Sequence, residues 1–473
     1  MSDLAQQLAD LSRRGALEQV VEQAQTALQQ QPGSLPVLLQ LAYACCKRQH
    51  HHQALEAALR ILHAPDLDLN HRVYGTRILC ISAAALGLAD WALPYVRSLE
   101  RALAHWPHAN DRCWPGRLLL ELDEAEQALA QFNAVCEQFA HDSELLRVYI
   151  GDARKRLGDS AGWHDLLAFS RQAFWRAHHA QAGLLESMWQ GQPLQGRSLA
   201  VVSDGGYGDF FQFSRYVRFL KSAGAREVVV VAPPNCQALL LSAGYDRVLG
   251  LDQQRQARQA ADHWCGSFGL EHARLLGAPL GAAAAYLHPP ATAAADAFMA
   301  QVQQRAQGKP CVALYWHSEA DSGETRSLPL HAVMPLLQRT DVHWVLLQRG
   351  YGLRQWLALR QGDAVSVLPE AMNFDETAGV VARLDAVISI DAWPVHLAAG
   401  MGVRTWLLAS RALDQRHENR ERESVLYPGI LTLARQPRLG DWPGAVQRLG
   451  VELDAWLHGR LGSSHPAVPV AAA

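Results

Sequence analysis

The stretch that decides the fold is Leu199-Ala-Val-Val-Ser-Asp-Gly-Gly-Tyr-Gly-Asp-Phe-Phe-Gln-Phe213. A short apolar run, typical of a buried strand, leads into a glycine turn and then into an apolar segment with helical spacing. This order forms a phosphate or sugar site, because Gly205, Gly206 and Gly208 let a ligand approach backbone N–H groups at a helix N-terminus. Asp209, at the mouth of the turn, is a candidate general base. The alternative is a tight turn in which Asp209 only caps the helix.

A second constellation follows the apolar run 386–390, which predicts a buried strand ending at Asp391. Pro394 suits the first turn of a following helix, and Gly400 suits its end. Asp391 and His396 therefore flank the carboxyl end of a parallel strand, the edge at which open α/β sheets bind ligands. A structural alternative has His396 inside a packed core, where it only caps the helix.

With other short strings in the same order, these segments resemble the glycosyltransferases that join tetratricopeptide repeats to a heptosyltransferase-like (family 9-type) GT-B catalytic unit. The resemblance covers residues 180–460. Two positions depart from the family pattern, Ala392 in place of a Thr and Ser318 in place of a Gly. The strings that carry the resemblance are Trp189-Gln190-Gly191, Leu194-Gln195-Gly196, residues 208–216, Trp316 with residues 326–330, Gln348-Arg349-Gly350, residues 373–377, residues 391–396, and Tyr427-Pro428 with Arg435-Gln436.

The resemblance implies two Rossmann-like halves, with the acceptor on the amino half and the nucleotide sugar on the carboxyl half. It implies Asp209 as the catalytic base, and Arg326 as the partner of the donor diphosphate, to which a guanidinium fork is suited. The other implied donor-binding residues are Ser327, Gln348, Asp391 and His396. No metal is expected, because no Asp-x-Asp lies at a strand end in the second half. No cofactor is expected besides the nucleotide-sugar donor substrate.

The amino-terminal region has a different hydrophobic pattern from the rest of the chain, because its apolar residues recur at helical spacing. A helix that includes Leu17, Val20 and Leu28 ends near Pro32, and a similar helix over residues 54–62 gives a period close to the ~34 residues of a tetratricopeptide repeat. We therefore predict a TPR-like helical solenoid, with an irregular helical bundle as the alternative. The concave face of a solenoid suits an acceptor protein, and the same surface could instead form a homo-oligomer.

From residue 198 onward, short apolar runs alternate with helical segments, which predicts two doubly wound halves. The predicted domains are a TPR-like repeat domain (1–160), connecting helices (161–195), an amino-terminal Rossmann-like half (196–300), a carboxyl-terminal Rossmann-like half (301–460) and a disordered tail (461–473). Aromatic residues of the connecting segment, Phe169, Phe174, Trp175 and Trp189, are expected to pack between domains. The predicted strands are 199–202, 228–232, 247–251 and 263–265 in the first half, and 311–315, 344–347, 365–368, 386–390 and 405–408 in the second.

Composition narrows the class of protein. A chain of 473 residues with a net charge of −3 has no polybasic signature, which argues against nucleic acid as a partner. The eight cysteines show no metal-ligand spacing and are predicted to be reduced, mostly buried thiols. We find neither a secretory signal nor an apolar stretch of ~20 residues, so a cytoplasmic protein without a transmembrane segment is expected. The triplet His50-His51-His52 is interpreted as a solvated turn, and the charged run 417–423 as an exposed loop near the donor cleft.

The sequence therefore predicts an inverting, metal-independent glycosyltransferase whose repeats recruit the acceptor. The repeats favour a protein acceptor, such as a flagellin or an adhesin. A saccharide or lipid-linked acceptor, as in heptosyltransferases, is the alternative. A rival interpretation is a catalytically decayed scaffold, which Ala392 and Ser318 would fit. An NAD enzyme is disfavoured, because the glycine turn lacks the full dinucleotide fingerprint.

Overall fold

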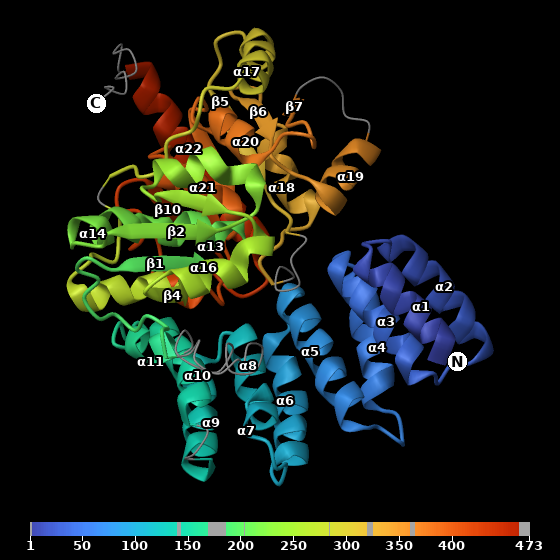
Figure 1. Ribbon diagram of the computed structural model, residues 1–473. Helices are drawn as coiled ribbons and strands as arrows, with labels where there is room; N and C mark the ends of the chain where they lie inside the picture. The colour runs from blue at the N-terminus through green and yellow to red at the C-terminus, as the bar shows by residue number, and fades with distance from the viewer. Residues whose placement is uncertain are drawn as a thin grey trace.

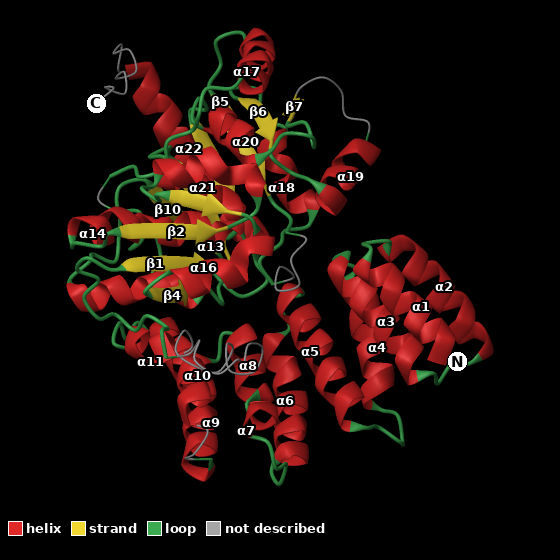
Figure 2. Ribbon diagram, viewed as in Figure 1, coloured by secondary structure: helices red, strands yellow, loops and turns green. Residues whose placement is uncertain are grey.

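The computed structural model describes residues 2–139, 143–168, 186–202, 204–282, 284–318, 325–359 and 365–462. An all-helical region comes first, and two parallel sheets with flanking helices follow it (Figures 1 and 2). This is the predicted fold class, which is confirmed. Ser203, the aromatic residues Phe169, Phe174 and Trp175, and the tail beyond residue 462 lie outside the described residues. Among the described helices, none has the length and apolar character needed to cross a bilayer.

Two helical hairpins of the amino-terminal region repeat with the predicted period. Helices α2 and α4 begin at Leu17 and His51, and α3 and α5 begin at Leu35 and Leu69, so both pairs are offset by 34 residues. Their apolar faces pack into a core that is separate from the core of the sheets. The helices are α1 (Ser2–Arg13), α2 (Leu17–Gln30), α3 (Leu35–Lys47), α4 (His51–Leu62), α5 (Leu69–Ala85), α6 (Ala89–Leu103), α7 (Ala109–Arg112), α8 (Trp114–Glu121), α9 (Ala125–Gln138), α10 (Ser143–Arg156) and α11 (Gly162–Ala168).

The first sheet has the order β3-β2-β1-β4, and all of its strands are parallel. Side chains of β1 alternate between two cores: Leu199 and Val201 face the main core, while Ala200 and Val202 face a smaller core that includes Ala257 of α16. The elements are β1 (Ser198–Val202), α13 (Tyr207–Phe213), η3 (Ser214–Tyr216), α14 (Val217–Ser222), β2 (Glu227–Val231), η4 (Pro234–Cys236), α15 (Gln237–Ser242), β3 (Arg247–Leu249), η5 (Leu251–Gln253), α16 (Gln254–Ala260), β4 (His263–Gly266) and η6 (Phe268–Leu276).

The second sheet is also parallel and has the order β10-β9-β8-β5-β6-β7. Five of its strands match the predicted runs to within one or two residues. The sixth, β10, was not predicted, which is a correction. The elements are α17 (Ala293–Ala306), β5 (Cys311–Tyr315), α18 (Leu330–Leu337), β6 (His343–Leu346), α19 (Gly350–Ala358), β7 (Val365–Val367), α20 (Phe374–Val381), β8 (Ala386–Ser389), α21 (Trp393–Gly400), β9 (Thr405–Ala409), η7 (Gln415–His417), β10 (Leu431–Arg435) and α22 (Trp442–Gly462).

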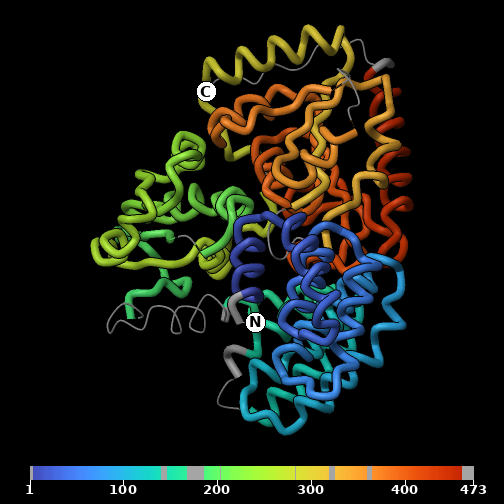
Figure 3. Tube along the Cα trace, turned by 90° about the vertical axis from the view of Figure 1, so that its right-hand side faces the viewer, coloured from blue at the N-terminus to red at the C-terminus, as the bar shows by residue number. Residues whose placement is uncertain are grey.

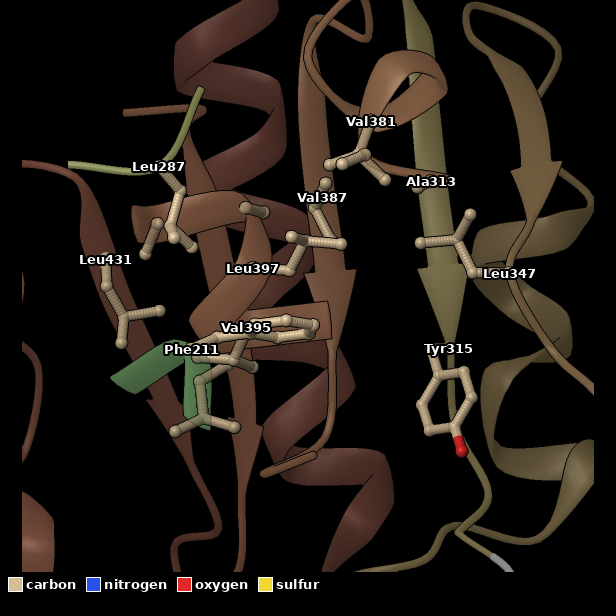
Figure 4. Packing of buried hydrophobic residues seen from close by; sticks show 14 of the residues in the cluster. Phe211, Leu287, Ala313, Tyr315, Leu347, Val381, Val387, Val395, Leu397 and Leu431 are labelled. Atoms are coloured by element: carbon tan, nitrogen blue, oxygen red, sulfur yellow. The ribbon is translucent and has the colours of Figure 1, made fainter. Parts of the chain in front are cut away.

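The two halves share one hydrophobic core. Phe211 of α13 belongs to the same buried cluster as Val395 of α21, and Figure 4 shows the two side chains next to each other. A polar contact also crosses between the halves, because the carboxylate of Asp375 accepts from the backbone N–H groups of Ala238 (3.0 Å) and Leu239 (2.8 Å). Asp375, at the start of α20, thus caps the start of α15 in the other half. The two halves are therefore in direct contact through both apolar and polar side chains.

The helical region packs against the carboxyl half (Figure 3). The hydroxyl of Tyr351 donates to the carbonyl of Arg48 over 3.3 Å, and Lys155 lies 3.6 Å from Glu418. At Gly440, whose φ is +83°, a Cβ would lie 2.5 Å from the carbonyl oxygen of Ala84, so this close approach requires glycine. All eight cysteines are unbridged and seven are buried, as the sequence predicted.

Candidate active site

The glycine turn lies where the first sheet reverses its strand order, between β1 and β4. Asp204 follows β1 and accepts a 2.7 Å hydrogen bond from the backbone N–H of Ser267, which follows β4, and another from the Ser267 hydroxyl. Burial raises the pKa of Asp204 from 3.8 to about 6, against the opposing effect of these bonds. Sequence reasoning missed Asp204 as a functional candidate, because its titration depends on burial against a distant strand.

Of the two roles that the sequence left open for Asp209, the structure shows the helix cap, and the role as a base stays a prediction. Its Oδ2 accepts from the backbone N–H of Gly206 over 2.9 Å, so it does cap α13. Its Oδ1 lies 3.4 Å from the guanidinium of Arg416 in the other half, and 17% of the side chain remains exposed, which leaves it accessible to a substrate. The Asp209 carboxylate lies against Gly205, because a Cβ at Gly205 would lie 2.5 Å from Oδ2 of Asp209. Asp209 is thus held in place by the turn and paired across the interface.

Gly208 explains how the halves come together. A Cβ at this position would lie 3.3 Å from Cδ2 of His396 and 3.4 Å from Cα of Trp393, so α13 approaches α21 closely at this glycine. Gly205, Gly206 and Gly208 all have ordinary negative φ values, so close approach explains at least two of these glycines better than backbone conformation does.

Arg416, in η7, is the centre of the site, and sequence reasoning missed it. One guanidinium nitrogen lies 2.6 Å from Oε1 of Gln212 and 3.3 Å from Nε2 of His396, while Nε donates to Asp414 over 3.0 Å. Burial acts to lower the pKa of Arg416, but Asp414, Asp391 and Asp209 outweigh it and raise the pKa. The site therefore holds a fixed cation among three carboxylates.

Asp391 and His396 lie together behind Arg416, at the edge of the second sheet that the sequence predicted. Asp391 lies 3.7 Å from the imidazoles of both His396 and His417. Burial opposes ionisation of Asp391, but contacts to His396, His417 and Arg416 outweigh it and hold its pKa well below the usual range. Asp391 is thus an ionised carboxylate held between two imidazoles and Arg416.

His396 is buried, with 1% of its surface exposed, and its Nδ1 lies 3.1 Å from the hydroxyl of Tyr427. Burial is the main cause that lowers its pKa below 6.5, so the ring is neutral at neutral pH. Of His396 and Arg416, it is therefore Arg416 that carries a positive charge.

Gln348 and Ser327 hold the segment that follows β5. The fully buried amide of Gln348 accepts from the backbone N–H groups of Trp316 (3.1 Å) and His317 (3.0 Å), and Ser327 Oγ accepts from the N–H of Ser318 (3.0 Å). Both side chains thus position the segment that carries Arg326. Arg326 lies after β5 and Asp391 after the neighbouring β8, at the point where the second sheet reverses its strand order. Direct donor contacts of Arg326, Ser327 and Gln348 remain predictions.

Two sequence interpretations need correction. The run 417–423 is not uniformly an exposed loop, because His417 is fully buried and Glu418 is 8% exposed, whereas residues 419–423 are exposed. His51 is not a freely solvated turn residue: its Nδ1 is buried, and burial, followed by the charges of His50 and His52, lowers its pKa to about 4. His417 lies 3.7 Å from Asp391, and Glu418 lies 3.6 Å from Lys155 of the helical region, so tertiary contacts account for the buried part of the run.

A cavity of about 260 Å³ adjoins the Arg416 cluster, and we call it the α10–η7 cavity. Gln212 and Arg416 line one side of it, and Asp152 and Lys155 of α10 line another. The helical region thus forms part of the wall next to Asp209 and Arg416. Among the described residues, no group of three or more His, Cys, Asp or Glu side chains could hold a metal ion.

Comparison with known proteins gives no matching family model and no matching curated protein. Solved structures do resemble the chain. A family 9 glycosyl transferase from Veillonella parvula shares 10% identity at a TM-score of 0.43, over 56% of this chain and 98% of that one. The E. coli ADP-heptose LPS heptosyltransferase II shares 13% identity at a TM-score of 0.42, over 56% of this chain and 99% of that one.

A third similar structure is an O-GlcNAc transferase from Thermobaculum terrenum. It shares 16% identity at a TM-score of 0.29, over 90% of this chain and 93% of that one. All three TM-scores lie below 0.5, so the fold assignment rests on the helical region and the two parallel sheets described above.

Proposed function

We propose that this protein is an inverting, metal-independent glycosyltransferase that moves a sugar from a nucleotide-sugar donor to an acceptor recruited by the helical region. The observation that carries the proposal is the junction of the two halves. Asp209 of the first half lies 3.4 Å from Arg416 of the second, and Arg416 lies 3.3 Å from His396. These residues follow the carboxyl ends of strands in both sheets, where ligands of open α/β sheets bind.

In the proposed reaction, Asp209 accepts the proton of an acceptor hydroxyl as that oxygen forms a bond to the anomeric carbon of the donor. The bond between the anomeric carbon and the diphosphate oxygen breaks, and the nucleoside diphosphate leaves with the electron pair. Attack opposite the leaving group inverts the configuration. The turn that fixes Asp209 supports this role, because a base must be held within hydrogen-bond reach of its substrate.

The leaving diphosphate needs positive charge, which Arg416 would supply, together with Arg326 in the segment after β5. The N-terminus of α21 would also favour the diphosphate. Ala392 gives this helix no side-chain cap, and the positive end of the helix dipole attracts an anion. His396, neutral and buried, would act on this site by holding Arg416.

A protein acceptor, flagellin-like or adhesin-like, is supported by the helical region. Helix α10 contributes Lys155 and Asp152 to the α10–η7 cavity, so a segment held by the helices would reach the wall of the site. A saccharide acceptor is the alternative in the same position.

The test is a thermal-shift panel of nucleotide sugars on the full chain, followed by transfer assays with Asp209→Asn. A donor at 100 times its Kd should add about 2.7 kcal/mol of stability. Asp209→Asn should keep that shift and lower turnover by about 10² or more, and EDTA should leave turnover unchanged. The absence of any shift across the panel would favour the decayed scaffold. Inhibition by EDTA that magnesium or manganese reverses would refute the metal-free mechanism.

A further inference from the structure

A second cavity lies between the helical region and the carboxyl half, and we call it the α4–α22 cavity. Its volume is about 590 Å³, within the range typical of small-molecule sites. Its walls are the turn before α4, the end of α5, the segments that follow β9 and β10, and the starts of α18 and α22. None of Asp209, Gln212, Asp391, His396 and Arg416 lines it, so it is separate from the Arg416 cluster, although Ser327 of the predicted donor site does line it.

The carboxyl half presents two buried polar side chains to this cavity. Gln436 is fully buried, and its Oε1 accepts from the backbone N–H groups of Arg411 (3.0 Å) and Gly440 (3.2 Å). These two bonds fix the orientation of the amide, so Nε2 is left as a donor without a protein partner. Ser410, 7% exposed, lines the same cavity, and its Oγ also has no protein partner.

The helical region faces them with two more polar groups. Both amide atoms of Gln49 are buried without a protein partner, and so is Nδ1 of His51. Gln49 has a φ of +60°, which is uncommon for a residue other than glycine. Burial, and then the charges of His50 and His52, lower the pKa of His51 to about 4, so its ring is neutral at neutral pH. Each such group costs free energy unless a ligand or solvent satisfies it.

The charge of the lining selects the class of ligand. No Lys or Arg is found among the described residues that line the cavity, and Glu121 adds a carboxylate. A phosphate or another anion would therefore meet no cation. A neutral ligand that both donates and accepts hydrogen bonds in several directions would match two amides, a hydroxyl and a neutral imidazole. Trp442, which is 5% exposed, also lines the cavity and adds apolar surface to it.

We propose that the α4–α22 cavity binds a neutral saccharide. Polar groups converge on it from three elements, the turn before α4 and the segments after β9 and β10, which suits a compact ring of hydroxyl groups better than the linear ladder of a peptide backbone. The inference concerns binding alone and does not require that the protein transfers sugar. Ser327 also lines this cavity and flanks Arg326, so the saccharide would lie beside the segment predicted to bind the donor.

The test uses the full chain and isothermal titration with an equimolar mixture of maltotriose, cellotriose, mannotriose and chitotriose. Gln49→Asn is the informative variant, because Asn tolerates positive φ while the shorter side chain withdraws the amide from the cavity. Gln307→Asn is its matched control, since Gln307 also has a positive φ (+51°) and ends α17 away from the cavity. Ser410→Ala removes a hydroxyl that makes no protein hydrogen bond and should leave the fold intact.

We expect saccharide binding that Gln49→Asn and Ser410→Ala each weaken at least tenfold and that Gln307→Asn leaves unchanged. Thermal scans must show all three variants folded. Three results would overturn the proposal: no binding of the four trisaccharides, binding that neither cavity variant weakens, or occupancy of the cavity by inorganic phosphate or a neutral pentapeptide in place of the saccharides. Donor binding in the nucleotide-sugar panel is scored separately, so the two proposals can fail independently.

Discussion

Replacing Asp204 with Asn should make the protein more stable at neutral pH. Burial raises the pKa of Asp204 from 3.8 to about 6, so the folded protein binds this proton more tightly than the unfolded chain does. Between these two values the folded state holds more protons, and stability therefore falls as the pH rises through the window. Asn cannot ionise, but its carbonyl oxygen can still accept from the N–H of Ser267.

The size of the effect follows from the two pKa values. At about 1.36 kcal/mol per pH unit, the difference between the folded and unfolded pKa lowers stability by about 3 kcal/mol at pH 7.5 and by about 1.6 kcal/mol at pH 5. A change of 3 kcal/mol corresponds to roughly 6 to 12 °C in Tm for a folding unit of about 150 to 250 residues. Asp204→Asn should therefore raise the Tm at pH 7.5 about twice as much as at pH 5.

Asp262 provides a matched control. It accepts from the backbone N–H and the hydroxyl of Ser198, both at 2.9 Å, as Asp204 accepts from the same two groups of Ser267. The Ser198 bonds lower the pKa of Asp262 to about 2, so Asp262→Asn should destabilise the protein at neutral pH. Differential scanning calorimetry of both variants at pH 7.5 and 5.0 decides the matter. An equal Tm rise for Asp204→Asn at both pH values, or a fall, would refute the burial argument.

Two further outcomes are expected from stability and activity assays. Arg416→Met should cost about 3 to 5 kcal/mol, the range for breaking a buried ion pair, and should abolish turnover, whereas Arg416→Lys should recover stability more than turnover, because lysine has a single nitrogen where arginine reaches Asp414 through Nε and Gln212 through a terminal nitrogen; full recovery of turnover by Arg416→Lys would contradict the geometric role. The folded pKa of His51, about 4, lies below its ordinary value of 6.5. Its contribution to the stability of the protein is therefore fully present above pH 6.5 and is lost as the pH falls, by about 2 kcal/mol at pH 5. His51→Gln should therefore shrink the Tm difference between pH 7.5 and 5.0, and the exposed His52→Gln should not; identical responses of the two variants would show that burial of His51 is not the cause.

Much of the fold could be predicted from the sequence, because buried parallel strands are short apolar runs and are easy to locate. The strand β5 coincides with its predicted run, Cys311–Tyr315. The strand β10 (Leu431–Arg435) was missed because it lies at the edge of the sheet, where Thr432 and Arg435 interrupt the apolar pattern. Pairing with β9 stabilises a strand that its own sequence only weakly specifies.

The candidate site was only partly predictable. The apolar runs of β1 and β8 and the helices after them predicted that Asp209 and Asp391 follow the carboxyl ends of parallel strands, which the structure shows, while their contacts with a ligand stay predictions. Arg416 could not be found in this way, because its partners Gln212 and His396 are brought to it by the closure of two domains. A run of alternating charges has no periodicity that distinguishes a buried member from an exposed one.

The helical region is in direct contact with the candidate site, so the acceptor recruitment and the catalysis that we propose cannot be tested in complete isolation from each other. Lys155 of α10 is 2% exposed and lies 3.6 Å from Glu418, two residues after Arg416. Burial is the main cause that lowers the pKa of Lys155, so its charge depends on nearby carboxylates, including Glu418. Glu418 in turn has a φ of +50°, an uncommon conformation that the surrounding contacts must hold. A ligand that moved α10 would therefore also move the segment that places Arg416 against Asp209, because this buried ion pair joins the two.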